Sequence, residues 1–237
     1  MNLQMVKEVV LLILVGISTT IMGQVLMEGS CPPIPVMKNF SPDKFLGTWY
    51  EIERYYSDYQ VNTKCNKIDF TYNPDGRIGI LTSAIQEKSG MPKVSYGLAN
   101  FEYGESARMT LSMTPTPGSP THLEFGYWIL DTDYESYAVV YSCDDFCRGR
   151  QHSKSIWVLG RTALLPQQVI HRIYDKIKVL GLDPKRLIKV DQHQCVNVAV
   201  SVRSENSVVS NSFDRNSARK FLASLTNIFG RKKYNYF

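Results

Sequence analysis

The stretch that decides the fold is Asn39–Tyr56, NFSPDKFLGTWYEIERYY. From Trp49 onward its residues alternate with a period of two, which predicts a β-strand. The segment before Gly47 predicts one helical turn, because Ser41 can cap it and Pro42 suits its first position. Gly47 can then release the chain into the strand. A large indole at the start of the strand suits a plug for one end of a closed sheet, although Trp49 taken alone also fits an ordinary core tryptophan.

Further segments with the same alternation follow, each bounded by turn residues: 65–72, 77–86, 94–98, 109–113, 123–129, 137–143 and 155–162. The turn at 73–76, Asn-Pro-Asp-Gly, is an example, since proline presets its first bend and glycine accepts a positive φ. Eight short strands at regular spacing are typical of an antiparallel sandwich or barrel. An eight-stranded up-and-down barrel has no exposed edges and can hold one small ligand. We therefore predict an all-β fold built on such a barrel.

After the last strand the period changes to that of a helix. Pro166 suits the first position of this helix, and Gly181 suits its end. Between them the apolar residues form one stripe: Val169, Ile170, Ile173, Ile177 and Leu180. We expect a single C-terminal α-helix that flanks the barrel.

Both ends of the chain differ from the middle. The apolar run Val9–Ile17 is too short to span a bilayer, so we predict a secretory signal peptide over residues 1–23, with an uncleaved anchor as the alternative. The folded domain is placed at 31–195, followed by a basic extension at 196–237. Within it, residues 217–229 have the spacing of an amphipathic helix on an anionic membrane surface; a disordered tail is the alternative.

Composition and charge exclude several classes of function. The 237 residues are 43% apolar, enough for one good core. After Cys195 the chain has seven basic and two acidic residues, a net charge of +5 that equals the net charge of the whole chain. Residues 1–195 are therefore formally neutral, and nucleic-acid binding by them has no electrostatic support. The histidines are scattered, and there is no G-x-S-x-G motif or Gly-rich loop between strand and helix. We predict no enzymatic activity, no metal and no cofactor.

The cysteines have no paired CxxC spacing, and export favours disulfides over zinc. Their number is odd, which leaves one thiol unpaired or paired between molecules: Cys31, Cys65, Cys143, Cys147 and Cys195. Asn39 begins an Asn-Phe-Ser glycosylation sequon, which the following Pro42 weakens.

Three stretches resemble the signatures of the lipocalin family, and they occur in the family's order. Gly47-Thr48-Trp49-Tyr50 resembles the first, Thr132-Asp133-Tyr134 the second, and Arg161 at the end of the last strand the third. Within the family, LGTWYEIER, YWILDTDYESYAVVYSC, WVLGR and VDQHQC are most similar to the group of apolipoprotein D and the insect Lazarillo-type lipocalins. The similarity covers about residues 31–195.

The resemblance implies an eight-stranded calyx that binds a small apolar molecule. It implies that Arg161 lies on the indole face of Trp49 at the closed end, in a cation–π pair of about 0.5–2 kcal/mol. It also implies the disulfides Cys31–Cys143 and Cys65–Cys195. The sequence around Cys147 departs from known relatives, so an exchange between Cys143 and Cys147 stays open.

The inward faces of the strands supply the candidate ligand contacts. By alternation we expect them to include, with Ile68, Ile78, Ile80 and Leu98, the following residues: Glu51, Phe70, Tyr72, Tyr96, Phe125, Tyr127, Val139, Trp157 and Leu159. Core packing is the alternative for each. For Glu51 we favour hydrogen bonds from neighbouring tyrosines over a role in orienting a ligand. Met109 and Met113 fit strand packing, or accessible thioethers that reduce lipid peroxides.

The favoured function is a secreted carrier of a small hydrophobic ligand, such as a fatty acid or sterol, that releases it at a membrane or receptor. A related alternative is a tetrapyrrole (bilin) carrier. An alternative of another class is a cell-surface interaction protein with a vestigial pocket, in which the loops at 88–92 and 114–120 make the contacts.

Overall fold

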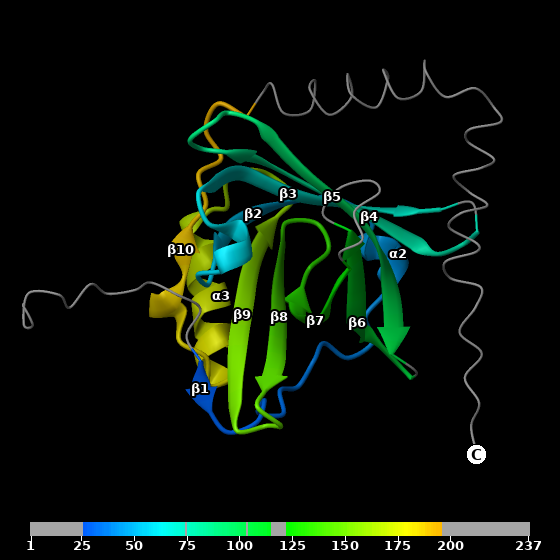
Figure 1. The fold of residues 1–237 in the computed structure, drawn as a ribbon, viewed down its shortest axis with the longest axis vertical. Helices are drawn as coiled ribbons and strands as arrows, with labels where there is room; N and C mark the ends of the chain where they lie inside the picture. Colours follow the sequence, from blue (N-terminus) through cyan, green and yellow to red (C-terminus); the bar gives the residue numbers. More distant parts are fainter. Residues whose placement is uncertain (1–25, 74, 103, 115–121, 196–237) are drawn as a thin grey trace, which may run out of the picture.

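The computed structural model describes residues 26–195 except 74, 103 and 115–121, so the predicted signal peptide and C-terminal extension lie outside the described residues. Eight long strands pair in sequence order, all antiparallel, and β9 pairs back with β2 (Figure 1). These are β2 (Gly47–Arg54), β3 (Thr63–Tyr72), β4 (Ile78–Gln86), β5 (Pro92–Glu102), β6 (Glu105–Thr114), β7 (Leu123–Thr132), β8 (Tyr137–Phe146) and β9 (Gln151–Gly160). The predicted eight-stranded up-and-down barrel is confirmed.

Short strands and helical turns flank the barrel. The strand β1 (Met27–Glu28) pairs with the start of β9, and β10 (Ile188–Lys189) pairs with the end of β2. The helical turn α2 (Pro42–Phe45) precedes β2, and the 3₁₀ turns η1 (Asp58–Gln60) and η2 (Pro184–Arg186) follow β2 and α3 respectively. Within the described part of the chain, no helix is long and apolar enough to cross a membrane.

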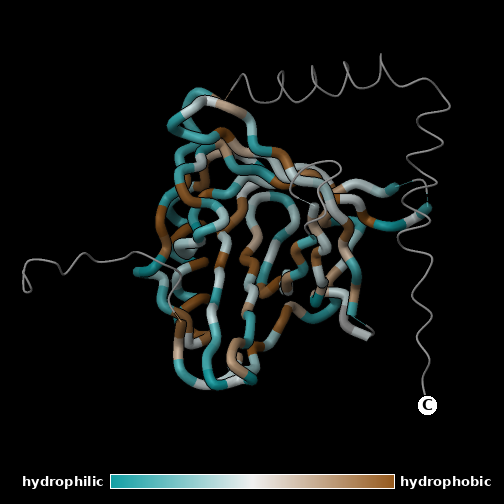
Figure 2. The backbone as a smooth tube through the Cα atoms, viewed as in Figure 1, coloured by the Kyte–Doolittle hydropathy of each residue, from teal (hydrophilic) through white to brown (hydrophobic). Residues whose placement is uncertain are grey.

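The helix α3 (Gln167–Val179) covers the outside of β8 and β9, as the apolar stripe predicts. Val169, Ile170, Ile173 and Ile177 are buried. They pack in one cluster with outward-facing residues of the strands, among them Val139, Tyr141, Ile156 and Val158. Apolar residues occur on both the helix and the strands beside it (Figure 2). Burying each aliphatic side chain contributes about 1.5–3 kcal/mol, which fixes the helix in place.

The closed end of the barrel is built on Trp49, which is fully buried. The Arg161 guanidinium lies 3.7 Å from the centroid of the Trp49 ring. On its other side the indole stacks on Phe45 at 4.9 Å, and its Nε1 donates to the Phe45 carbonyl at 2.8 Å. Arg161 also donates to the carbonyls of Lys44, Thr48 and Tyr134. One cation therefore joins α2, β2 and the β7–β8 turn at the base.

The β7–β8 turn carries the second signature. The Asp133 carboxylate accepts the N–H groups of Glu135, Ser136 and Tyr137. Partial burial raises the pKa of Asp133, but these hydrogen bonds together with the Ser136 hydroxyl bring it below its ordinary value. The Thr132 hydroxyl bridges the turn by donating to the Tyr137 carbonyl and accepting from the N–H of Tyr134. These residues support the fold at the base, far from the open end.

The two disulfides are those that the resemblance implies. Cys31 pairs with Cys143, with Cα atoms 5.9 Å apart, and Cys65 pairs with Cys195 at 5.5 Å. Cys147 is free and exposed, so it does not replace Cys143. The first bridge ties the extended N-terminal segment to β8, and the second ties the segment after β10 to β3.

Candidate functional site

The lower half of the barrel interior is densely packed. A column of aromatic rings rises from the base, with centroid separations of 5.3 Å from Phe45 to Phe70, 5.8 Å from Phe70 to Tyr127 and 6.1 Å from Tyr127 to Trp157. The interior residues beside it are almost completely buried, among them Trp49, Met109, Leu111, Ile129, Val140 and Leu159. We call this buried set the floor. Phe70, Tyr127 and Leu159 face inward as predicted, but their exposure of 1–4% makes them packing residues of the floor.

Met109 and Met113 also belong to this interior cluster, with exposures of 2% and 3%. Strand packing, the favoured interpretation, is therefore confirmed, and the alternative of accessible thioethers is wrong. Both residues pack where methionine is a flexible gap-filler, opposite Tyr127 and Leu123 across the β6–β7 pair.

Three of the predicted ligand contacts do not face the interior. Tyr72 lies past the base, is 52% exposed, and its hydroxyl donates to Asp43 of α2. Val139 is fully buried, but on the outer face of β8 beneath α3. The residues of β8 that point inward are instead Ala138 and Val140. Both faces of β8 are apolar because one covers the interior and the other receives the helix.

The predicted inward face of β5, with Tyr96 and Leu98, is also wrong by one residue. Ala99 pairs with Ile78 and Leu111, and all three are buried inside the barrel. The inward set of β5 is therefore Ser95, Gly97 and Ala99, which puts Tyr96 and Leu98 on the outside. The interior is narrow here: a Cβ on Gly97 would collide with the Ser112 carbonyl and the Met113 sulfur.

The upper half of the interior is more open and more polar. Leu123, Phe125 and Trp157 are only partly buried and pack on the cluster below them. Trp128 has the opposite parity and lies outside, with the Arg108 guanidinium 4.2 Å from its ring centroid. Phe125 and Trp157 thus remain candidate contacts near the open end, which we call the mouth.

A β-bulge in β2 turns two charged residues into the mouth. Glu51 pairs with Leu159, and the register then shifts so that Arg54 pairs with Trp157. Because Leu159 and Trp157 are inward residues, Glu51 and Arg54 both face the interior although they are three positions apart. Glu53 is left on the outside, where the Tyr174 hydroxyl donates to it at 2.7 Å. Gly47 lies at the start of the strand, and neither glycine nor proline stands at the bulge between Glu51 and Glu53. Alternation along the sequence therefore did not reveal Arg54.

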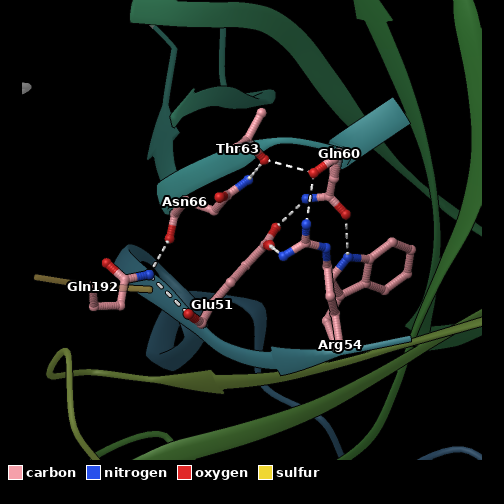
Figure 3. Close-up of polar contacts among 7 residues, drawn as sticks. Glu51, Arg54, Gln60, Thr63, Asn66 and Gln192 are labelled. Carbon is pink, nitrogen blue, oxygen red and sulfur yellow. Dashed lines mark hydrogen bonds and ion pairs between the residues drawn. The ribbon is translucent and has the colours of Figure 1, made fainter. Parts of the chain in front are cut away.

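The carboxylate of Glu51 is held by an amide and a guanidinium (Figure 3). The Gln60 side chain donates to Glu51 Oε1 at 2.6 Å, and Arg54 Nη1 lies 3.9 Å from Oε2. Burial raises the pKa of Glu51, while Arg54 and Gln60 act to lower it. No hydrogen bond from a tyrosine reaches it among the described residues, so the favoured expectation for this residue is wrong.

Gln60 bonds to residues of three strands at the mouth: β2, β3 and β9. Its side-chain oxygen accepts from Trp157 Nε1 at 3.0 Å, and its backbone carbonyl accepts from Arg54 Nη2 at 2.6 Å and from the Thr63 hydroxyl at 2.7 Å. Next to it, the Tyr59 hydroxyl lies 2.9 Å from Ser95 Oγ, and Lys93 Nζ donates to the Tyr59 carbonyl at 2.5 Å. The η1 turn, which we call the lid, therefore bridges from β2 and β3 to β5 across the mouth.

Several polar atoms of the mouth have no hydrogen-bond partner in the part of the chain that the structure describes. Asn66 donates to the Thr63 hydroxyl at 3.1 Å, but its Oδ1 is buried and unbonded. The same is true of Glu51 Oε2 and Arg54 Nε. We call Glu51, Arg54, Gln60 and Asn66 the polar cluster. From outside the barrel, Gln192 fixes its backbone by donating to the carbonyls of Glu51 and Asn66 at 2.8 and 2.9 Å.

The comparisons with known proteins agree with this geometry. Residues 41–192 match the model of a lipocalin-like domain, which covers the whole barrel and α3. The chain belongs to the lipocalin family. Membership places it with carriers of small hydrophobic molecules rather than with enzymes. Within the described residues no group of three or more His, Cys, Asp or Glu side chains could hold a metal ion.

Relatives of this lipocalin include apolipoprotein D of Mus musculus, 33% identical over 183 residues that cover 77% of this chain and 93% of the relative. The Lazarillo protein of Schistocerca americana is 25% identical over 165 residues, or 68% of this chain and 74% of that protein. Among solved structures, insecticyanin of the tobacco hornworm Manduca sexta has a TM-score of 0.65 at 20% identity over 73% of this chain and 91% of its own. Lobster apocrustacyanin A1 has a TM-score of 0.58 at 24% identity over 71% and 92%. The structural likeness concerns the fold.

Proposed function

We propose that this lipocalin is a secreted carrier that takes up one lipid, such as a fatty acid, a sterol or a similar molecule, in the upper half of its barrel. The observation that supports this most is the layering of the interior. Above a floor of almost completely buried side chains, Phe125, Trp157 and Leu123 offer partly exposed apolar surface. The lid is held to this end of the barrel by hydrogen bonds to Ser95 and Trp157. The protein sequesters the lipid from water and makes or breaks no covalent bond.

Apolar burial supplies the affinity in this proposal. Each methylene removed from water contributes about 0.8 kcal/mol before the costs of association are subtracted. The tail would lie against Phe125, Leu123 and the face of Trp157, with Tyr127 beneath it. Because Phe70 and Leu159 are covered by their neighbours, they support these contacts from below and do not meet the lipid.

The proposal includes secretion, so that the protein acts outside the cell. Two disulfides suit an oxidising compartment, where such bonds persist. The predicted signal peptide at 1–23 would deliver the chain there. Asn39 has an exposed side chain on the surface at the closed end, so a glycan on it would not obstruct the mouth. The extension at 196–237 would assist delivery at an anionic membrane if it forms the predicted amphipathic helix.

A tetrapyrrole carrier is the alternative within the family. The packed floor favours the lipid, because a tetrapyrrole is broader than an acyl chain or a sterol and would need the space that Phe70, Tyr127 and Leu111 fill. The surface-interaction alternative would use the β4–β5 turn at 88–92 and the loop at 114–120, most of which lies outside the described residues.

Protein purified from its own tissue tests the proposal directly. Mass spectrometry of an organic extract should find a lipid at close to one molecule per protein chain. A visible absorption band in the native protein would instead support the tetrapyrrole. If the extract contains neither, and the purified protein binds no added fatty acid or sterol, the carrier function is wrong.

A further inference from the structure

The polar cluster at the mouth carries both charges of an ion pair inside the barrel. Glu51, Arg54 and Asn66 are 9%, 5% and 5% exposed. Burying a lone charge is costly, and the pair lowers that cost because one negative and one positive group are brought in together. The two charges cancel, so a ligand group that binds next to this ion pair binds at a site with no net charge.

The cluster also has unused hydrogen-bonding capacity. Among the described residues, Glu51 Oε2 and Asn66 Oδ1 are acceptors without a hydrogen-bond partner, and Arg54 Nε is a donor without one. A buried polar atom left unbonded is costly, so a ligand that bonds to these atoms would recover part of that cost. The complementary group must donate a hydrogen bond and accept one.

A hydroxyl meets these demands and a carboxylate does not. The hydroxyl can donate to Glu51 or Asn66 and accept from Arg54 without adding charge. A carboxylate accepts only, and it would bring a second negative charge next to Glu51. An ammonium donates only, and it would place a second positive charge next to Arg54.

The position of the cluster suits a head group. Its Glu51, Arg54 and Asn66 lie on β2 and β3, and its Gln60 belongs to the lid. Leu123 and Phe125 lie on β7, which is not a neighbour of β2 or β3 in the sheet. Trp157 connects the two sides, since its ring contacts Tyr127 and its N–H bonds to Gln60. An amphiphile in the mouth would have its polar end at the cluster and its tail on β7.

We infer that the ligand is a neutral lipid with a terminal hydroxyl group, such as a long-chain alcohol or a sterol, and that Glu51 is the residue that excludes lipid carboxylates. This inference deepens the proposed function and rests on it.

Two ligands with the same chain test the inference. We suggest titrating the full-length protein at pH 7.4 with 1-tetradecanol and with tetradecanoate, below their aggregation limits, and following tryptophan fluorescence. The alcohol should bind at least tenfold more tightly. In Glu51→Gln the acid should gain at least tenfold in affinity, because Arg54 then lacks a counter-ion, while the alcohol should change by less than threefold.

Glu53→Gln is the matched control, since it removes the same charge from the same strand on the outer face and should leave both affinities unchanged. Thermal unfolding of each variant checks that it is folded. Equal or tighter binding of the acid by the wild-type protein would overturn the inference and leave the carrier function in place. An unchanged preference in folded Glu51→Gln would overturn it as well. If the wild-type protein binds neither ligand nor cholesterol, the carrier function itself fails.

Discussion

The two halves of the barrel interior are built on different principles. At the base, Trp49, Phe45 and Phe70 are buried, and Arg161 makes each of its hydrogen bonds to a backbone carbonyl. At the mouth, buried atoms of Glu51, Arg54 and Asn66 have no hydrogen-bond partner among the described residues, and Phe125 and Trp157 are only partly covered. A region in which every group is satisfied stabilises the fold, whereas unsatisfied groups around a partly exposed apolar wall are typical of a binding site. Stability and binding should therefore respond to mutation at opposite ends.

The largest effect on stability is expected at the base. Trp49→Ala should lower the free energy of unfolding by about 3–5 kcal/mol, because it creates a cavity and removes the surface on which Arg161 lies. Chemical denaturation measures this loss. Trp157→Ala, at the mouth, should cost less than half as much. Equal losses for the two variants would show that the interior is not divided into a structural and a binding half.

The Cys65–Cys195 disulfide supports the mouth from outside, since it fixes the segment that carries Gln192. The double variant Cys65→Ala/Cys195→Ala should be less stable by about 2–5 kcal/mol in denaturation experiments. Cys147→Ser is the control and should change stability by less than about 0.5 kcal/mol, because Cys147 is free and exposed. Non-reducing peptide mapping should recover Cys31–Cys143 and Cys65–Cys195; a Cys31–Cys147 peptide would contradict the pairing.

Ligand binding should depend on Trp157 more than on the other tryptophans. We expect a bound lipid to quench the intrinsic fluorescence, and Trp157→Ala to abolish most of the quenching and weaken affinity about tenfold, since an aromatic face is lost from the wall. Trp128→Phe should leave both nearly unchanged, because Trp128 packs against Arg108 outside the barrel. Quenching that survives in Trp157→Ala and disappears in Trp128→Phe would place the binding site outside the mouth.

The smallest effect concerns pH, and it should have opposite signs at the two ends. The pKa of Glu51 is raised on folding, so the native protein binds more protons than the unfolded chain, and stability falls as the pH rises from the ordinary value of 4.5 through the folded pKa. The pKa of Asp133 is lowered, so its contribution is present above the ordinary value of 3.8 and is lost as the pH falls through the folded pKa. Unfolding of Glu51→Gln and Asp133→Asn across this range should separate the two slopes. The same slope in both variants would contradict the assignment.

The base could be predicted from the sequence because each of its parts has a local signal. Gly47 before Trp49, the turn at Asp133 and the single Arg161 at a strand end are recognisable without knowledge of their partners. The stripe of α3 is equally clear, since only one face of that helix is apolar. For such elements the pattern of residue types determines the structure.

The mouth could not be predicted in the same way. The bulge that turns Arg54 inward has no residue that marks it, and strict alternation would place Arg54 outside. In β5 and β8 both faces carry apolar residues, so alternation cannot tell which face is the interior. The inward face of β5 depends on the room beside Met113, where a residue with a Cβ at position 97 would collide with the Met113 sulfur. Such choices depend on neighbouring strands that are distant in the sequence.

The contacts of Gln60 bear on how fast a cargo is exchanged. One residue bonds to Glu51, Arg54, Thr63 and Trp157, so these bonds are lost together whenever the lid lifts. If a cargo leaves past the lid, we expect its residence time to depend on one opening event that precedes its departure. Ligands of different affinity would leave at similar rates if that event is the slow step. Substitution of Gln60 would shorten the residence time of every cargo, whatever its head group.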